Sequence, residues 1–104
     1  MYPKFKNKTI LFSLNRYERK KNINLAIESF AEFKHKYPQS AQDTILIIAG
    51  GYDTRLPENV EHHEELINLA KELQVDEETF FLRSITNEQR ITLLKDSKVL
   101  LYTP

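Results

Sequence analysis

The stretch "TILFSLNRYERKKNINLAIESF" (residues 9–30) decides the fold, because it joins a strand pattern to a helix pattern through a basic loop. Its first six residues form a short, almost wholly apolar run, which is typical of a strand buried on both faces of a parallel sheet. Further along, Ile23, Ile27 and Phe30 recur at helical spacing. A strand followed closely by a helix is the opening half of a βαβ unit.

Three further apolar runs separated by helix-period segments repeat this arrangement along the chain. The runs are at residues 44–50, 79–84 and 98–104. The helix-period segments between them begin near Glu58 and Asn87, and we expect Asn22 and Asn87 to cap the first and third helices. The order β-α-β-α-β-α-β, with right-handed crossovers, predicts an α/β fold: a Rossmann-like parallel sheet with flanking helices.

The length of the chain suits one small domain, and its sequence ends directly after the fourth apolar run. A complete doubly wound domain would usually add two more βα units. We therefore expect residues 1–104 to be a single partial domain, truncated after the fourth strand. The chain contains no cysteine, which removes thiolate metal sites, and no apolar run approaches the ~20 residues that span a bilayer.

Charge is unevenly distributed in a chain whose net charge is zero. Residues 1–21 hold seven basic residues and one acid, whereas residues 53–78 hold nine acids and two bases. Because the charges cancel overall, nothing global favours nucleic acid or an anionic membrane as a partner. The basic start nevertheless concentrates four cations in the first loop: Arg16, Arg19, Lys20 and Lys21.

This first loop lies where doubly wound folds bind ligands, outside the carboxyl end of a strand and before a helix N-terminus that attracts anions. The fork of Arg16 and the point charge of Lys21 could clamp a diphosphate. The alternative is a solvated polar loop. Cations at a helix N-terminus are electrostatically unfavourable unless an anion offsets them. The residues alone leave both the diphosphate clamp and the solvated loop open as interpretations.

Other candidate residues lie at the ends of the second and third apolar runs. Gly50 and Gly51 could let the backbone approach a nucleotide, or they could form a tight turn that needs positive φ. Arg83 could position a donor or a base, or pair with an acid of the second helix. His62 and His63 are adjacent and point about 100° apart, so we expect a solvated helix face there and no metal site.

Aromatic residues are expected mainly in the core, namely Phe12, Phe80, Phe81 and Tyr102. Tyr17 is then the aromatic residue among the loop cations that could stack on a nucleic-acid base. An interaction module for RNA or acidic partners is therefore a weak third hypothesis.

The loop "NRYERKKNINLAI" resembles the first βα turn in the C-terminal domain of GT-B glycosyltransferases of the glycosyltransferase group 1 family, which includes glycogen synthase and many mannosyltransferases. That family has an Arg, a Lys five positions later and then a small residue before an apolar helix. Here these positions are Arg16, Lys21 and Asn22. The family usually has Gly where this chain has Asn15 and Asn22, and Asn also tolerates left-handed backbone geometry.

Three segments extend the resemblance over essentially the whole chain: "LFSLNRYERKKNINLAIESF", "LIIAGGYDTRLPENVEHHEEL" and "FLRS…LLKDSKVLLYTP". Together they are similar to the dolichol-pathway α-1,3/1,6-mannosyltransferases of asparagine-linked glycosylation. The resemblance implies a retaining transfer of mannose from GDP-mannose to dolichol-linked Man1GlcNAc2 and Man2GlcNAc2, with no cofactor and no metal. It places the parent protein at the cytosolic face of the endoplasmic reticulum membrane.

The same resemblance implies roles for particular residues. Arg16 and Lys21 would hold the GDP diphosphate and stabilise charge on the leaving phosphate, and Gly50, Gly51 and Arg83 would contact the donor. The isolated 104 residues would be inactive, because the acceptor-binding part lies elsewhere in such enzymes. The rival hypothesis from the residues themselves is a non-catalytic nucleotide- or phosphate-binding Rossmann-like module.

Overall fold

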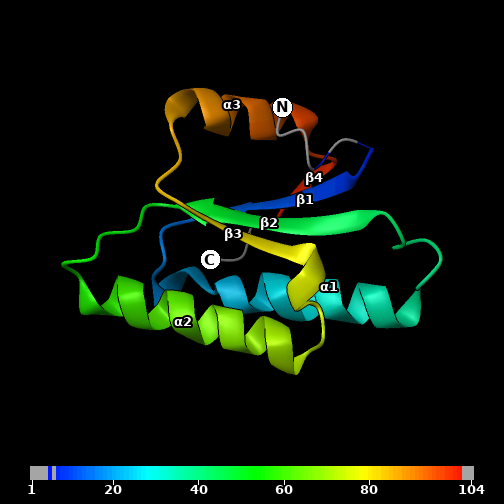
Figure 1. The fold of residues 1–104 in the computed structure, drawn as a ribbon, viewed down its shortest axis with the longest axis horizontal. Helices are drawn as coiled ribbons and strands as arrows, with labels where there is room; N and C mark the ends of the chain where they lie inside the picture. The colour runs from blue at the N-terminus through cyan, green and yellow to red at the C-terminus, as the bar shows by residue number, and fades with distance from the viewer. Residues whose placement is uncertain (1–4, 6, 102–104) are drawn as a thin grey trace.

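In the computed structural model, which describes residue 5 and residues 7–101, four parallel strands form one sheet (Figure 1). The strands are β1 (Thr9–Leu14), β2 (Thr44–Gly50), β3 (Thr79–Arg83) and β4 (Val99–Leu100). Their order in the sheet is β3-β2-β1-β4, and each neighbouring pair runs parallel. The predicted parallel sheet is therefore confirmed.

The helices cover both faces of this sheet. Helices α1 (Ile23–Lys36) and α2 (Pro57–Glu72) lie on one face, and α3 (Asn87–Asp96) lies on the other (Figure 1). Short 3-10 turns, η2 (Arg19–Lys21) and η3 (Asp76–Glu78), precede α1 and β3. Within the described residues, no helix is long and apolar enough to cross a membrane.

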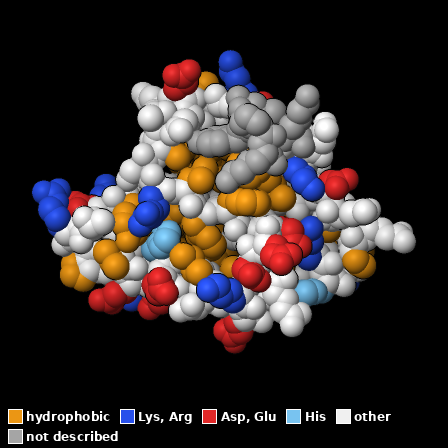
Figure 2. Space-filling model, viewed as in Figure 1, with side chains coloured by type: hydrophobic (Ala, Val, Ile, Leu, Met, Phe, Trp, Pro, Cys, Tyr) orange, Lys and Arg blue, Asp and Glu red, His pale blue; other side chains and the backbone are white. Residues whose placement is uncertain are grey.

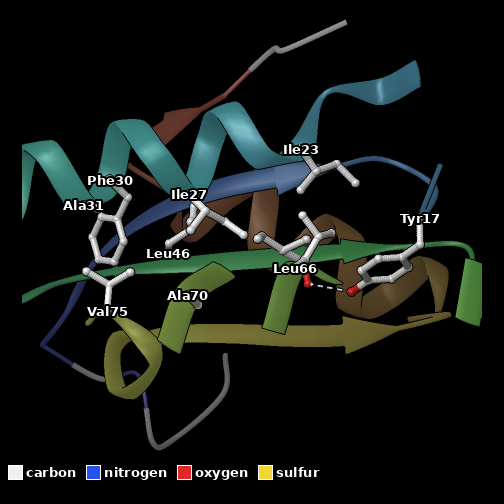
Figure 3. Packing of buried hydrophobic residues seen from close by; sticks show 10 residues of the cluster. Tyr17, Ile23, Ile27, Phe30, Ala31, Leu46, Leu66, Ala70 and Val75 are labelled. Carbon is white, nitrogen blue, oxygen red and sulfur yellow. Dashed lines mark hydrogen bonds between the residues drawn. The ribbon is translucent and has the colours of Figure 1, made fainter. Parts of the chain in front are cut away.

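Strand β2 is buried along its whole length because both helix layers pack on it. Leu46 and Ile48 belong to the cluster beneath α1 and α2, which Figure 3 shows, together with Ile27 and Phe30. On the opposite face, the alternate residues Ile45, Ile47 and Ala49 of β2 join a second cluster, whose other buried members are Phe5, Ile10, Phe12 and Leu93. The continuous apolar run in the sequence thus reflects a strand with two covered faces.

The aromatic residues expected in the core behave differently from one another. Phe12 is fully buried, whereas Phe80 and Phe81 are half-buried because β3 forms an edge of the sheet. Tyr102 lies outside the described residues, as do the last residues of the predicted fourth strand. Strand β4 spans Val99–Leu100, which pair with β1, and is shorter than predicted because the described neighbours Lys98 and Leu101 lie outside it.

The two predicted helix caps were each partly wrong. Asn22 stands at the start of α1 in the left-handed conformation, with φ 55° and ψ 40°, and its side chain makes no capping bond. Helix α3 is capped by Thr86, one residue before the predicted Asn87. The Thr86 hydroxyl accepts from the Gln89 N–H (3.1 Å), and the Gln89 side chain accepts from the Thr86 N–H (2.9 Å). This reciprocal capping box fixes the helix start.

Candidate functional site

The loop from β1 to α1 lies against the carboxyl end of β2. The Asn15 N–H donates to the Ala49 carbonyl (3.0 Å), and the Tyr17 N–H donates to the Gly51 carbonyl (3.3 Å). The chain then forms η2 and enters α1 through the left-handed Asn22. The parallel sheet therefore brings this basic loop next to the glycines that end β2.

An open cavity of about 320 Å³ lies at this edge of the sheet. It is lined by Leu14, Asn15, Arg16, Lys21, Gly50, Gly51 and Arg90. Four of the five residues predicted to bind a donor thus share one cavity, while the fifth, Arg83, is elsewhere. A hollow that combines three cations with two glycines has the chemistry to receive an anion such as a diphosphate.

The cations of the loop have different surroundings, so they are not interchangeable. Arg16 lines the cavity, and its Nε lies 3.5 Å from Glu18 Oε2, in an ion pair whose Arg16 side chain is exposed and whose Glu18 side chain is half-buried. Lys21 lines the same cavity. Lys20 does not: its side chain is 77% exposed, and its Nζ lies 3.9 Å from Glu18 Oε1.

Arg19 turns away from the cavity and binds helix α2. Its backbone N–H donates to Glu58 Oε2 (3.0 Å), and its Nη2 donates to Glu65 Oε2 (2.9 Å) and Glu61 Oε1 (3.4 Å). The hydrogen bond from Arg19, followed by the one from His62, lowers the pKa of Glu65 to about 2. The basic start of the chain and its acidic segment therefore meet at this contact.

The predicted positive-φ turn at the two glycines is wrong, since neither glycine has positive φ, and only Gly50 is needed for close approach. A β carbon on Gly50 would lie 1.6 Å from the carbonyl oxygen of Asn15, which no side chain can accommodate. On Gly51 it would meet Arg16 Cγ at 3.6 Å, an ordinary contact. Gly50 is required because the β1–α1 loop crosses directly over the end of β2.

Tyr17 is fully buried beneath the loop that carries it. Its hydroxyl donates to the Leu82 carbonyl at 2.8 Å. The same hydroxyl lies 3.2 Å from the Ile48 carbonyl, the contact that the dashed line in Figure 3 marks. Burial raises the pKa of the Tyr17 phenol. A ring in this position cannot stack on a nucleic-acid base, so the RNA hypothesis loses its aromatic platform.

The prediction that the two histidines of α2 lie on a solvated helix face is wrong. His62 is buried, with Nδ1 2.9 Å from Glu65 Oε1. The half-buried His63 ring packs edge-on against Tyr17 (5.0 Å between centroids) and Tyr52 (5.2 Å). Burial and the nearby charge of Arg83 lower the pKa of His63.

Helix α2 buries a stripe that the apolar pattern did not reveal, because its first members are polar. The stripe consists of Asn59, His62, Leu66 and Ala70. These residues follow the three- and four-residue spacing of a helix face. In the part of the chain that the structure describes, no group of three or more histidines, cysteines and acids could hold a metal ion.

Arg83 occupies a separate part of the surface, along the edge strand β3. Its guanidinium lies 4.8 Å from the centre of the Tyr52 ring, a cation–π contact in place of the alternative ion pair with α2. It lines a second cavity of about 480 Å³ between β3 and α2. Figure 2 views this side of the molecule, where hydrophobic side chains are exposed between the two helix layers.

Two residues of the site were not found from the sequence. Arg90 reaches the cavity from α3, on the opposite face of the sheet from the basic loop. The clue in the sequence was that Arg90 lies in the first turns of a helix that begins at the carboxyl-end edge of the sheet, where ligands bind. Asn59 is buried near the start of α2 and contacts the loop. In the sequence it lies within "LIIAGGYDTRLPENVEHHEEL", a segment that carries the resemblance to the glycosyltransferase family and gives no sign that Asn59 is buried.

A protein-family model described as "Glycosyl transferases group 1" matches residues 2–104, which is nearly the whole chain. The chain belongs to the group 1 glycosyl transferases. The resemblance noted in the sequence is therefore confirmed at the level of the family.

Curated relatives of this glycosyltransferase chain carry a more specific name. It is 46% identical over 101 residues to "Alpha-1,3/1,6-mannosyltransferase ALG2" of Mus musculus, covering 95% of this chain and 24% of the mouse protein. It is 42% identical over 105 residues to the Homo sapiens protein of the same name, covering 100% of this chain and 25% of the human one. The chain thus spans about a quarter of the length of the curated relatives it matches.

Solved structures agree with the fold of this glycosyltransferase chain. The "OtsA apo structure" matches with a TM-score of 0.81 and 18% identity, over 95% of this chain and 23% of that one. "Trehalose-6-phosphate from E. coli bound with UDP-2-fluoro glucose" matches with a TM-score of 0.79 and 17% identity, over 97% and 24%. These neighbours are GT-B glycosyltransferases, in agreement with the fold expected from the sequence.

Proposed function

We propose that this chain forms part of the donor-binding domain of a mannosyltransferase that assembles the N-glycan precursor. The observation that carries the proposal is the cavity at the carboxyl ends of β1 and β2, where Arg16 and Lys21 meet Gly50 and Gly51. The names of the curated relatives, which are 46% and 42% identical to the chain in the mouse and human proteins, support mannose as the transferred sugar.

The donor is GDP-mannose, and the cavity holds its diphosphate. In transfer, the bond between the anomeric carbon of mannose and the β-phosphate oxygen breaks, and its electron pair stays on GDP. A new bond forms from the same carbon to the oxygen of an acceptor hydroxyl, with retention of configuration, and the hydroxyl proton passes to the departing phosphate. Arg16 and Lys21 stabilise the charge that develops on the leaving phosphate, an electrostatic contribution that enzymes use widely. Arg83 contacts the donor only if its stack on Tyr52 opens toward the cavity.

The acceptor is dolichol-linked Man1GlcNAc2 or Man2GlcNAc2, bound by parts of the parent protein beyond these 104 residues. Binding of the acceptor outside these residues is supported by the relatives' length, of which the chain covers about a quarter. The parent protein works at the cytosolic face of the endoplasmic reticulum membrane, and residues 1–104 form a partial domain of it. No cofactor or metal takes part.

The rival function is a non-catalytic nucleotide- or phosphate-binding module of the same fold. The same cavity would bind a diphosphate in both cases, so binding alone does not separate the two functions. Transfer of mannose does, because only the enzyme turns over GDP-mannose.

The experiment is steady-state kinetics of mannose transfer by the full-length protein that carries this domain. Replacing Arg16 or Lys21 with Ala removes a charge-assisted contact and is expected to lower kcat/KM roughly ten- to hundredfold. Lys20→Ala is the matched control and should be nearly silent, because Lys20 lies outside the cavity.

Equal losses for Lys20→Ala and Lys21→Ala would contradict the phosphate site. Binding of GDP without any transfer from GDP-mannose would favour the non-catalytic module.

A further inference from the structure

Two cations on a loop form a useful anion site only if the loop is held in one conformation, since a site that is about 1 Å too loose loses much of its effect. On one side the β1–α1 loop is held by the end of β2, through the bonds of Asn15 and Tyr17 described above. Its other side faces α2. What α2 contributes there therefore decides how firmly Arg16 and Lys21 are placed.

Asn59 joins the loop to α2 through a buried amide. Asn59 is only 1% exposed, and its Nδ2 donates to the carbonyl of Tyr17 at 3.1 Å. Its Oδ1 accepts from the N–H of Asp53 at 3.0 Å. One amide thus links the loop after β1 to the loop after β2. Only a side chain with a donor and an acceptor can make both bonds.

The residue that Asn59 holds is itself a fixed point of the loop. The Tyr17 hydroxyl is bonded to the carbonyl of Leu82 on β3, so residue 17 is held at both its backbone and its side-chain end. Arg16 directly precedes this point. Two residues beyond it, Arg19 is bound to Glu58 and Glu65 of α2, and Lys20 separates it from Lys21. Arg16 therefore adjoins a residue that α2 anchors, and Lys21 lies two residues from another.

We propose that Asn59 is a positioning residue of the donor site, which sets the path of the β1–α1 loop so that Arg16 faces the cavity that Lys21 also lines. This inference rests on the proposed function, because it assigns Asn59 an effect on a nucleoside diphosphate. Asn59 lies behind the loop and acts through Arg16, so it contacts no ligand. Its effect is confined to the phosphate part of the donor.

The test is a double-mutant cycle in the full-length protein, with the Kd for GDP measured by calorimetry and guanosine as a ligand without phosphates. Asn59→Ala should weaken GDP binding about tenfold, as expected for residues coupled through one network. In an Arg16→Ala background the same change should cost less than about twofold, because the residue it positions is gone. Guanosine binding should be unchanged. Asn68→Ala, an exposed asparagine of the same helix, is the control.

A merely structural role gives another pattern, in which Asn59→Ala lowers the thermal midpoint and affects GDP and guanosine alike in both backgrounds. That result, or unchanged GDP binding, would overturn the inference.

If Asn59→Ala gives no folded protein, Arg19→Gln probes the same loop from an exposed position. It should weaken GDP binding about threefold, again only when Arg16 is present, and no change would also overturn the inference. The donor site itself fails separately, if Arg16→Ala has no effect on GDP.

Discussion

Gly50 and Asn15 lie so close together that a β carbon on Gly50 would be 1.6 Å from the carbonyl oxygen of Asn15. Gly50 also accepts from the Ser84 N–H (2.8 Å), so the loops that follow β1 and β3 both pack onto it. The opposing atom at Asn15 is backbone, and that backbone is itself bonded to Ala49. The loop cannot move away from a side chain at position 50 without breaking this bond.

Gly50→Ala is therefore expected to displace the basic loop and to destabilise the domain by about 3 kcal/mol or more, at the upper end of overpacking effects. GDP binding should weaken as well, because Arg16 moves with the loop. Urea unfolding and a GDP titration check both effects. Gly51→Ala is the matched control, since its β carbon would meet only the flexible Arg16 side chain, at 3.6 Å from Cγ and 3.9 Å from Nε. Equal destabilisation by the two substitutions would contradict the close approach.

Arg90→Ala tests the cavity from the opposite face of the sheet. Arg90 reaches the cavity from α3, and its Nη2 donates to the Asn87 side chain at 2.9 Å, which holds the guanidinium in place. Because Arg90 is exposed, its loss should weaken GDP binding by roughly three- to tenfold, less than a buried charge-assisted bond. Lys95→Ala, an exposed cation further along α3, should leave the Kd unchanged. A Kd for the Arg90 variant equal to that of wild type would remove α3 from the site.

The sequence predicted the layout of the fold well because the strands are short apolar runs with both faces covered. The burial of all seven residues of β2 shows why such a run does not alternate. The sheet edge that gathers Arg16, Lys21, Gly50 and Gly51 follows from parallel strands alone. Prediction failed for the helix caps, because a cap is defined by a single position. Thr86 caps α3 in place of Asn87, since Gln89 completes a capping box with Thr86.

The sequence could not predict residues whose role depends on tertiary contacts. Asn59 and His62 look like solvent-exposed helix residues, and they are buried because the β1–α1 loop and Arg19 cover that part of α2. Tyr17 stands among cations and is nevertheless buried, since two backbone carbonyls lie within reach of its hydroxyl. Arg90 required knowledge of where α3 crosses the sheet.

Tyr17→Phe tests the buried hydroxyl. Removing it deprives the carbonyl of Leu82 of its bond with Tyr17, which should lower the free energy of unfolding by about 1 kcal/mol. The ring itself remains, so its edge-on contacts with Tyr52 and His63 persist. Chemical denaturation measures the change, with Tyr37→Phe as the control because Tyr37 is 52% exposed. No difference between the two variants would show that the Tyr17 hydroxyl contributes nothing to stability.

The contact between Arg19 and Glu65 predicts a particular dependence of stability on acid. The pKa of Glu65 falls from its ordinary value of 4.5 to about 2 in the folded protein, chiefly through the hydrogen bond from Arg19 and then the one from His62. The unfolded chain therefore binds a proton at Glu65 at a higher pH than the folded chain does. The stabilisation is fully present above pH 4.5, declines as the pH falls, and is lost below about pH 2.

Glu65→Gln should remove this component, so that the free energy of unfolding of the variant falls less steeply than that of wild type between pH 4.5 and 2. The effect is modest, because the Glu65 side chain is 52% exposed and solvent screens the pair. Adding salt should reduce it further.

The measurement is urea unfolding at a series of pH values, with Glu64→Gln as the control, since Glu64 is exposed on the same helix. Because other carboxylates titrate in the same range, the difference between variant and wild type is the quantity to compare. Parallel curves for wild type and Glu65→Gln would mean that Arg19 does not hold Glu65 in solution, and that the loop is fixed to α2 by its contacts with Asn59, Glu58 and Glu61.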